Sequence, residues 1–231
     1  MPDVTIRAKD GGQFSAYLAT PKSGRGPGIV VIQEIFGVNP WVRQIADRCA
    51  AMGYVAMAPD LFWRQEPGIQ LTDQTKEDWG KAFKLMEGLN QAKAVEDIQA
   101  TIDALRGNPA CTGKVGAVGY CLGGRLAYMT ATGTDADAAV GYYGVALDGL
   151  VGNAGKITHP LMLHIAEKDQ FVSADVQAKV HAALDGNQHV TLHDYAGQDH
   201  AFARDGGEHF DQAAATLAND RTAAFFKQNL A

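Results

Sequence analysis

One stretch constrains the fold more than any other: a short apolar run that ends in Gly119-Tyr120-Cys121-Leu122-Gly123-Gly124. The run predicts a buried strand, and the residues from Leu122 to about Ala131 predict a helix. A strand, a sharp turn and a helix at this spacing form the nucleophile elbow G-x-S-x-G, here with cysteine in place of serine. The glycines fit this turn because bulky neighbours would clash there, and the helix start favours a thiolate. The alternative is a buried structural cysteine in a glycine-rich turn.

Apolar runs that predict strands alternate with helical segments along the rest of the chain. Such alternation predicts an α/β fold, in which a mostly parallel sheet has helices on both faces. No linker or internal repeat is evident, and a single domain over residues 1–231 is expected. Strands are predicted at 4–6, 14–18, 29–32, 54–58, 115–118, 138–143, 161–166 and 189–195. Helices are predicted at 41–52, 79–89, 92–105, 122–131, 174–184 and 210–228, with a loop or lid at 60–78.

Two polar residues follow predicted strands, and the carboxyl ends of strands are where such sheets place their sites. Asp169 comes just after the 161–166 strand, and His200 comes just after the 189–195 strand. A thiol needs a nearby base, and the base needs a third group to fix its tautomer. We therefore predict a triad of Cys121, His200 and Asp169, in the chain order of the α/β-hydrolases. Asp199 is the alternative acid, although a neighbour in sequence is poorly placed to reach the ring nitrogen.

Four motifs stand out along the chain: Gln33-Glu34-Ile35-Phe36-Gly37-Val38-Asn39, Gly119-Tyr120-Cys121-Leu122-Gly123-Gly124, Gly141-Tyr142-Tyr143-Gly144 and His200-Ala201-Phe202-Ala203-Arg204. Together they resemble the motifs of the dienelactone hydrolase family, the carboxymethylenebutenolidases. The resemblance covers essentially the whole chain and implies a compact, monomeric α/β-hydrolase that uses no cofactor. It implies hydrolysis of an enol-lactone, dienelactone, to maleylacetate in chloroaromatic breakdown.

The resemblance also implies a catalytic role for Glu34, which follows the 29–32 strand. In the resembling enzymes this carboxylate contacts the resting cysteine, then moves on substrate binding and helps to generate the thiolate. The physics is consistent, because a nearby carboxylate disfavours a thiolate and an apolar strand end favours the protonated acid. The alternative is a carboxylate in an internal ion pair. The backbone N–H groups of Ile35 and Leu122 are the expected oxyanion hole.

The substrate contacts depart from the family pattern. Arg204 matches the family arginine that follows the catalytic histidine, and arginine binds a carboxylate through two parallel hydrogen bonds. The second family arginine corresponds to Trp79, and the serine after the histidine is Ala201. Both changes remove groups that would hold the carboxylate of the substrate. With Phe36 and Phe83, Trp79 is predicted to line a more apolar pocket, although aromatic residues at such spacings also form cores.

Composition bears on the partners and the compartment expected for the chain. The net charge of −6 argues against a nucleic-acid partner and supplies no basic patch for a membrane. Three widely spaced cysteines, Cys49, Cys111 and Cys121, do not form a disulfide framework and suit a reducing compartment. The start, Met1-Pro2-Asp3-Val4, does not resemble a signal peptide. Together with the predicted triad and the family resemblance, these features lead us to expect a cytoplasmic enzyme that acts on a small lactone or ester.

Three other hypotheses remain open. His189 and His193 could suggest a metal site, but they lie in a strand-like run without an evident third ligand, so no metal is expected. The fold could serve a ligand-binding protein without activity, although that would need a broken triad. Cys121 could be a redox sensor, although no resolving cysteine is well placed. Among enzymes, the alternative is a carboxylesterase or lactonase that acts on a less acidic substrate.

Overall fold

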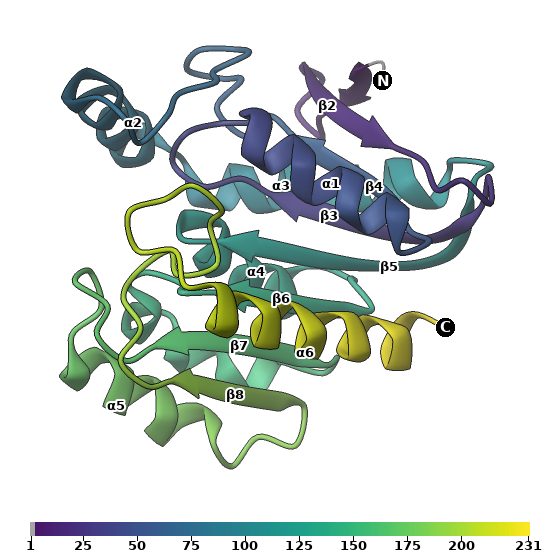
Figure 1. Cartoon of the computed structure of the whole chain (residues 1–231). Helices are drawn as coiled ribbons and strands as arrows, with labels where there is room; N and C mark the ends of the chain where they lie inside the picture. The colour runs from purple at the N-terminus through teal and green to yellow at the C-terminus, as the bar shows by residue number, and fades with distance from the viewer. Residues whose placement is uncertain (1–2) are drawn as a thin grey trace. The chain divides into compact units, whose positions relative to one another are not determined.

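The computed structural model describes residues 3–231, and every predicted strand and helix is present in it (Figure 1). Met1 and Pro2, which belong to the segment used to argue against a signal peptide, lie outside the described residues. The strands are β1 (Asp3–Arg7), β2 (Gln13–Ala19), β3 (Gly26–Ile32), β4 (Val55–Pro59), β5 (Cys111–Tyr120), β6 (Ala138–Tyr142), β7 (Leu161–Ala166) and β8 (Val190–Tyr195). The helices are α1 (Pro40–Ala51), α2 (Lys76–Gly88), α3 (Gln91–Arg106), α4 (Leu122–Gly133), α5 (Ala174–Leu184) and α6 (Gln212–Leu230), with 3₁₀ turns η1 (Leu147–Gly149) and η2 (Val151–Lys156).

Two strands begin earlier than predicted for a common reason. Strand β3 begins at Gly26 and β5 begins at Cys111, each earlier than its apolar run, because backbone pairing continues where the side chains are no longer apolar. The 3₁₀ turns η1 and η2 were not predicted, because they have no apolar period to mark them.

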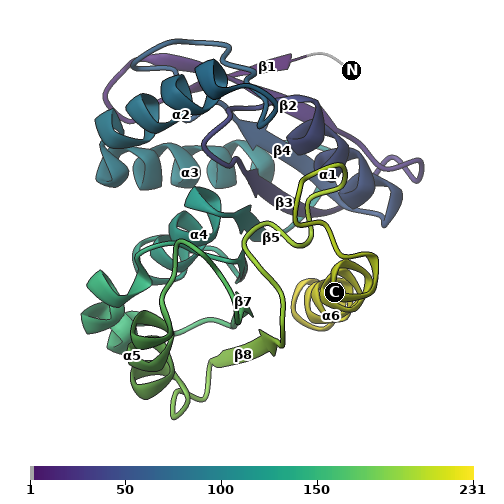
Figure 2. The same ribbon diagram turned by 60° about the vertical axis from the view of Figure 1, so that its left-hand side comes forward.

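The first of two compact units ends at Ala117 and contains β1 to β4 in the order β1-β2-β4-β3. β3 and β4 are parallel, whereas β2 pairs with β1 and β4 in antiparallel fashion. Helices α1 and α3 pack on opposite faces of β3 and β4 (Figure 2). Ile29, Val30, Val31 and Ile32 are therefore fully buried, as expected for a strand covered on both sides.

The second unit begins at Val118, within β5, and contains the parallel strands β6, β7 and β8 in that order. Helix α6 packs on one face of these strands, and α4 and α5 pack on the other (Figure 2). Each unit has its own buried residues, and a single domain over residues 1–231 stays a prediction. In the part of the chain that the structure describes, no helix is long and apolar enough to cross a membrane.

A buried polar network joins α6 to these strands. The ring of His164 on β7 lies 2.8 Å from the Tyr195 hydroxyl through Nδ1 and 2.9 Å from the Thr222 hydroxyl through Nε2. Thr222 lies 2.6 Å from the Tyr142 hydroxyl. Burial, followed by the charges of His193 and Arg221, holds the pKa of His164 well below its usual value, so the ring is neutral. The polar side chains beneath the strand ends that carry the candidate site are therefore hydrogen-bonded to one another.

Candidate active site

Cys121 lies at the sharp turn between β5 and α4, with φ of 55° and ψ of −115°. A positive φ at a residue other than glycine is strained and persists only where the surroundings enforce it. The Cys121 N–H donates to the Tyr142 carbonyl at 3.0 Å, which ties the turn to β6. A Cβ atom on Gly119 would lie 2.0 Å from the Gly123 carbonyl oxygen, so this position requires glycine. The turn leaves the thiol partly exposed.

Leu122 is the first residue of α4 and is almost fully buried. The first N–H groups of a helix have no acceptor within that helix, and the helix dipole makes its start attractive to negative charge. The geometry of this turn therefore suits the role predicted for the Leu122 N–H, which is to donate to an oxyanion formed beside Cys121.

Asp169 and His200 come together in the second unit, although they are 31 positions apart in the sequence. His200 Nδ1 lies 2.8 Å from Asp169 Oδ2, and both side chains are buried. The other oxygen, Asp169 Oδ1, accepts the backbone N–H of Phe171 at 2.9 Å. Because a carboxylate only accepts hydrogen bonds, Nδ1 carries the proton of this bond, and Nε2 is the nitrogen that can exchange a proton.

The pKa of His200 reports the proximity of Cys121. Burial lowers this pKa, but the charge of Cys121 and hydrogen bonds to Asp169 and Cys121 outweigh it and raise the pKa to about 10. Nε2 is buried, and among the described residues the charge of Cys121 makes the largest contribution that raises the pKa of the ring. A thiolate at Cys121 and an imidazolium at His200 would therefore stabilise each other.

Two aromatic rings fix the plane of the His200 imidazole. The ring of Phe171 lies 4.8 Å from the imidazole, and the ring of Tyr143 lies 5.1 Å from it, both edge-on. Tyr143 and Ala201 both have positive φ, at 37° and 63°. Phe171 is 46% exposed, so this ring also presents an apolar surface next to the imidazole.

Asp199 joins the loop that carries His200 to the loop that carries Asp169. Its Oδ1 accepts the backbone N–H of His200 at 2.6 Å and that of Gln170 at 3.0 Å. Burial raises the pKa of Asp199, but these N–H groups and the charges of His209 and His200 lower it overall. Asp199 is thus bonded to the backbone of His200, whereas Asp169 is bonded to the ring. The sequence suggested Asp199 only as an alternative acid and gave no sign of this contact.

The residues predicted from the motif after β3 lie in the first unit and are all buried. Glu34, Ile35 and Phe36 are 2%, 3% and 2% exposed. The preceding residue, Gln33, accepts the backbone N–H of Leu61 through Oε1 at 3.0 Å. This bond joins the end of β3 to the segment that follows β4, and so fixes the backbone that carries Glu34.

The aromatic residues predicted to line a pocket form one cluster in the first unit. Phe36 contacts Trp79 edge-on at 5.0 Å, and Trp79 contacts Phe83 at 5.5 Å. Trp79 Nε1 donates to the Asp73 carbonyl at 3.0 Å, which orients the indole. Phe83 is 36% exposed, so the cluster runs from the core to the surface. It provides an apolar surface at the position of the family's second arginine.

Arg204 lies on the loop after β8 and is half-buried. Its backbone N–H donates to the Ala201 carbonyl at 2.9 Å, and its carbonyl accepts from Gly207 at 3.0 Å. A Cβ atom on Gly207 would lie 2.9 Å from Arg204 Nε, so glycine there leaves room for the guanidinium. Ala201 is buried, at 3% exposure.

Three further cysteine and histidine candidates, Cys49, Cys111 and His193, pack within the protein and lie outside the predicted triad. Cys49 and Cys111 are buried, and burial raises the pKa of Cys49 to about 12 despite the opposing charge of Arg48. The His193 ring stacks on His164 at 5.8 Å, and its pKa is lowered by burial and then by Arg221. Across residues 3–231, no group of three or more His, Cys, Asp or Glu side chains could hold a metal ion.

Comparison with known proteins identifies the family of the chain. The model of the dienelactone hydrolase family matches residues 14–230. A putative carboxymethylenebutenolidase of Azospirillum brasilense is 54% identical, with 100% of both chains covered. Carboxymethylenebutenolidase 1 of Cupriavidus pinatubonensis is 37% identical over 95% of this chain and 93% of its own. The crystal structure of a putative dienelactone hydrolase from Klebsiella pneumoniae has a TM-score of 0.86 at 27% identity and covers 98% of each chain. The chain therefore belongs to the dienelactone hydrolase family of carboxylic ester hydrolases.

Proposed function

We propose that this enzyme hydrolyses small enol-lactones or activated esters, with Cys121 as the nucleophile, His200 as the base and Asp169 as the group that orients the base. One observation carries this proposal. The buried Asp169–His200 pair has its free nitrogen near a thiol on a strained turn, and the charge of Cys121 contributes to raising the pKa of His200. A thiol and a base held in this way match the requirements of covalent catalysis.

In the first half of the reaction, the Cys121 thiolate attacks the carbonyl carbon of the substrate. A bond forms between Sγ and carbon, and the π electrons of the carbonyl move to its oxygen. The Leu122 N–H, and by family resemblance the Ile35 N–H, stabilise that oxyanion. When the carbonyl re-forms, the C–O bond of the ester breaks and the enolate leaves, taking a proton from His200 Nε2. An enolate is a better leaving group than an amine, so ester cleavage is favoured over peptide cleavage.

In the second half, water hydrolyses the thioester. His200 Nε2 takes a proton from the water as its oxygen attacks the thioester carbon. The C–S bond then breaks, and the products are a carboxylic acid and the original pair of thiolate and imidazolium. Asp169 keeps its hydrogen bond to Nδ1 throughout and stabilises the charged ring.

Glu34 is proposed to help generate the thiolate, as the family resemblance implies. Its burial at 2% exposure is unusual for a carboxylate and supports a specific role. Glu34→Gln keeps the shape but removes the charge, so kcat should fall while the protein stays folded. An unchanged kcat would leave Glu34 as a structural residue.

The substrate is proposed to be a lactone or ester less acidic than dienelactone. The relatives are named carboxymethylenebutenolidases, but Trp79 and Ala201 replace two family groups that would hold a carboxylate. The cluster of Phe36, Trp79 and Phe83 offers apolar surface instead. Arg204 is then the remaining group for a substrate carboxylate. A monomeric state and a cytoplasmic location belong to the same proposal.

The decisive experiment measures hydrolysis of dienelactone, of a neutral enol-lactone and of a simple aryl ester by the purified enzyme. Wild type should turn over at least one of them, and Cys121→Ala should turn over none. Arg204→Ala should lose activity selectively on the substrate that carries a carboxylate. Equal activity in wild type and Cys121→Ala would overturn the cysteine mechanism. Tight binding without turnover would favour a binding protein instead.

A further inference from the structure

The loop that carries Asp169 connects β7 to α5 and consists of two consecutive turns. The Asp169 N–H donates to the Ala166 carbonyl at 3.3 Å, and the Val172 N–H donates to the Asp169 carbonyl at 3.2 Å. The position of the Asp169 carboxylate therefore depends on the positions of the two ends of this loop, Ala166 and Val172.

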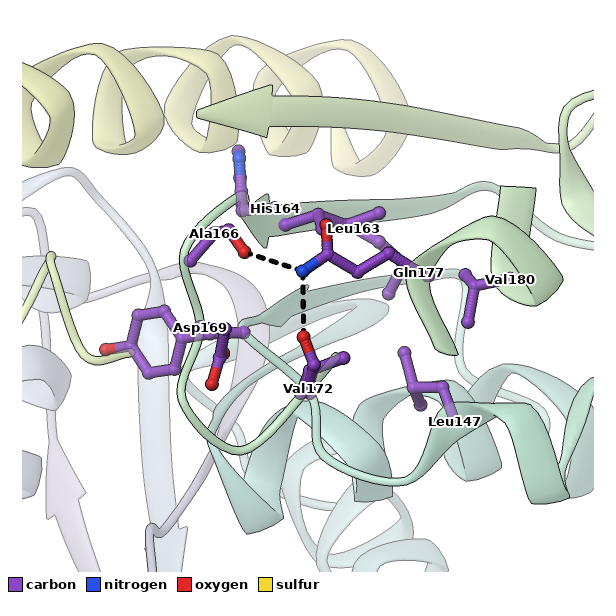
Figure 3. A pocket seen from close by; sticks show the side chains of 11 residues that line it. Leu147, Leu163, His164, Ala166, Asp169, Val172, Gln177 and Val180 are labelled. Carbon is purple, nitrogen blue, oxygen red and sulfur yellow. Dashed lines mark hydrogen bonds between the residues drawn. The ribbon is translucent and has the colours of Figure 1, made fainter. Parts of the chain in front are cut away.

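A single side chain holds both ends. Gln177, the fourth residue of α5, points its amide back at the loop (Figure 3). Its Nε2 donates to the Val172 carbonyl at 2.9 Å and to the Ala166 carbonyl at 3.1 Å, with the Glu167 carbonyl at 3.3 Å. The Ala166 oxygen that accepts from Gln177 is the same atom that accepts the Asp169 N–H. The Gln177 amide therefore bonds to the same carbonyl oxygen that holds the backbone N–H of Asp169.

The surroundings make this amide hard to replace. Gln177 borders a recess of about 20 Å³, which is room for roughly one water molecule, and Asp169 lines the same recess. Leu147, Leu163 and Val180 form much of its wall (Figure 3). A wall of this kind offers a water molecule few hydrogen-bonding partners. Without the Gln177 amide, the Ala166 and Val172 carbonyl groups would each lose a hydrogen bond that water is poorly placed to replace.

We propose that Gln177 is a positioning residue for the reaction: its side-chain amide closes the 166–172 loop and so holds Asp169 against His200. This inference rests on the proposed function, because it assigns Asp169 the role of orienting His200. No property of the sequence around Gln177 pointed to this role, since glutamine is ordinary on an amphipathic helix.

The test uses two variants of Gln177 and one control. Gln177→Met keeps the length of the side chain and most of its volume, so water cannot easily take the place of the amide. Gln177→Glu keeps the shape but turns a carboxylate oxygen towards carbonyl oxygens. The control, Gln212→Met, makes the same change on α6, where Gln212 Nε2 donates to the exposed Thr216 hydroxyl at 3.1 Å and to no other group among residues 3–231.

Two measurements are made on each variant: hydrolysis of an aryl ester over a range of pH, and alkylation of Cys121 by iodoacetamide at neutral pH. Cys121→Ala gives the background from Cys49 and Cys111, which are buried. In Gln177→Met, kcat should fall about 10- to 100-fold with little change in KM, because a small displacement of a catalytic group has that cost. Alkylation should slow as well. The alkaline limb of the pH profile should move to lower pH by roughly one unit, because a weaker bond to Asp169 lowers the pKa of His200.

Gln177→Glu should lose more activity, and part of it should return at acid pH, where the protonated carboxyl group can donate one hydrogen bond. If Gln177→Met does not fold, this recovery decides the question. Gln212→Met should match wild type in both measurements. The inference is overturned if Gln177→Met keeps the wild-type kcat, pH profile and alkylation rate. If wild type hydrolyses no ester but alkylation still slows in Gln177→Met, the proposed function fails and the positioning role stands.

Discussion

Two buried carboxylates, one in each unit, show how similar ion pairs serve different purposes. Asp97 on α3 accepts Trp63 Nε1 at 2.9 Å and Arg64 Nη2 at 3.1 Å, and Arg64 Nη1 forms a second contact. Asp169 accepts His200 Nδ1 at 2.8 Å. Arginine keeps its proton at any physiological pH, so the first pair can only hold structure together. Histidine has a second nitrogen that can exchange a proton, so the second pair can do chemistry.

The Asp97 pair anchors the segment after β4 that was predicted to be a loop or lid. Arg64 also bonds Asp10 at 2.8 Å, in the turn between β1 and β2, and its guanidinium stacks over the Trp63 ring at 4.1 Å. At least the start of this segment is therefore fixed to α3 and to that turn. The segment is also held beyond Arg64, because the Leu71 N–H donates to the Phe36 carbonyl at 2.9 Å and the Leu71 carbonyl accepts from Asn39 Nδ2 at 3.0 Å.

The largest effect should come from Asp169→Asn. The amide keeps the size of the carboxylate but cannot stabilise a charged imidazolium and can select the wrong tautomer. The kcat for ester hydrolysis should fall about 10³- to 10⁴-fold, in a variant that still folds. Steady-state kinetics together with a melting curve would test this. A variant that retains a tenth of wild-type kcat would remove Asp169 from the mechanism.

The matching change in the other pair, Asp97→Asn, should affect stability instead of chemistry. It removes the charge that Arg64 faces in a buried site, and we expect a loss of about 2–3 kcal/mol in the free energy of unfolding. Urea denaturation would measure it, with Asp10→Asn as the control, because Asp10 is exposed and should matter little. If Asp97→Asn slowed hydrolysis at full stability, the contrast between the two pairs would fail.

Asp199→Ala should have an intermediate effect, because it removes the link between the backbone N–H groups of His200 and Gln170. We expect kcat to fall about tenfold, as the His200 backbone gains freedom. Asp199→Asn keeps an oxygen that can accept both N–H groups and should retain most of the activity. If Ala and Asn at this position behaved alike, the charge of Asp199 would matter more than its hydrogen bonds.

The two pairs also differ in how far sequence could predict them. Cys121, Asp169 and His200 could be selected because β-branched and apolar runs mark strands, and parallel strands end at one edge of a sheet. The burial of Asp97 is visible in the sequence, because Asp97 lies on the apolar stripe of α3, beside Ile98 and four residues before Thr101. The roles of Asp199 and Gln177 could not be predicted, because each depends on which backbone groups of a loop one side chain reaches. Sequence periodicity describes which face is buried and not which carbonyl a side chain meets.

The smallest change tests the link between Cys121 and the charge state of His200. In Cys121→Ala the thiolate is absent, so the pKa of His200 should fall clearly below about 10, although Asp169 still supports it. A raised pKa in the folded state stabilises the protein fully below the unfolded value near 6.5, and this contribution of His200 is lost as pH rises towards about 10. NMR titration of the His200 ring in wild type and in Cys121→Ala would measure the difference in pKa directly. Equal titration curves would mean that the thiol and the imidazole are uncoupled. The pair of His200 and Asp169 would then be structural, like the pair of Arg64 and Asp97.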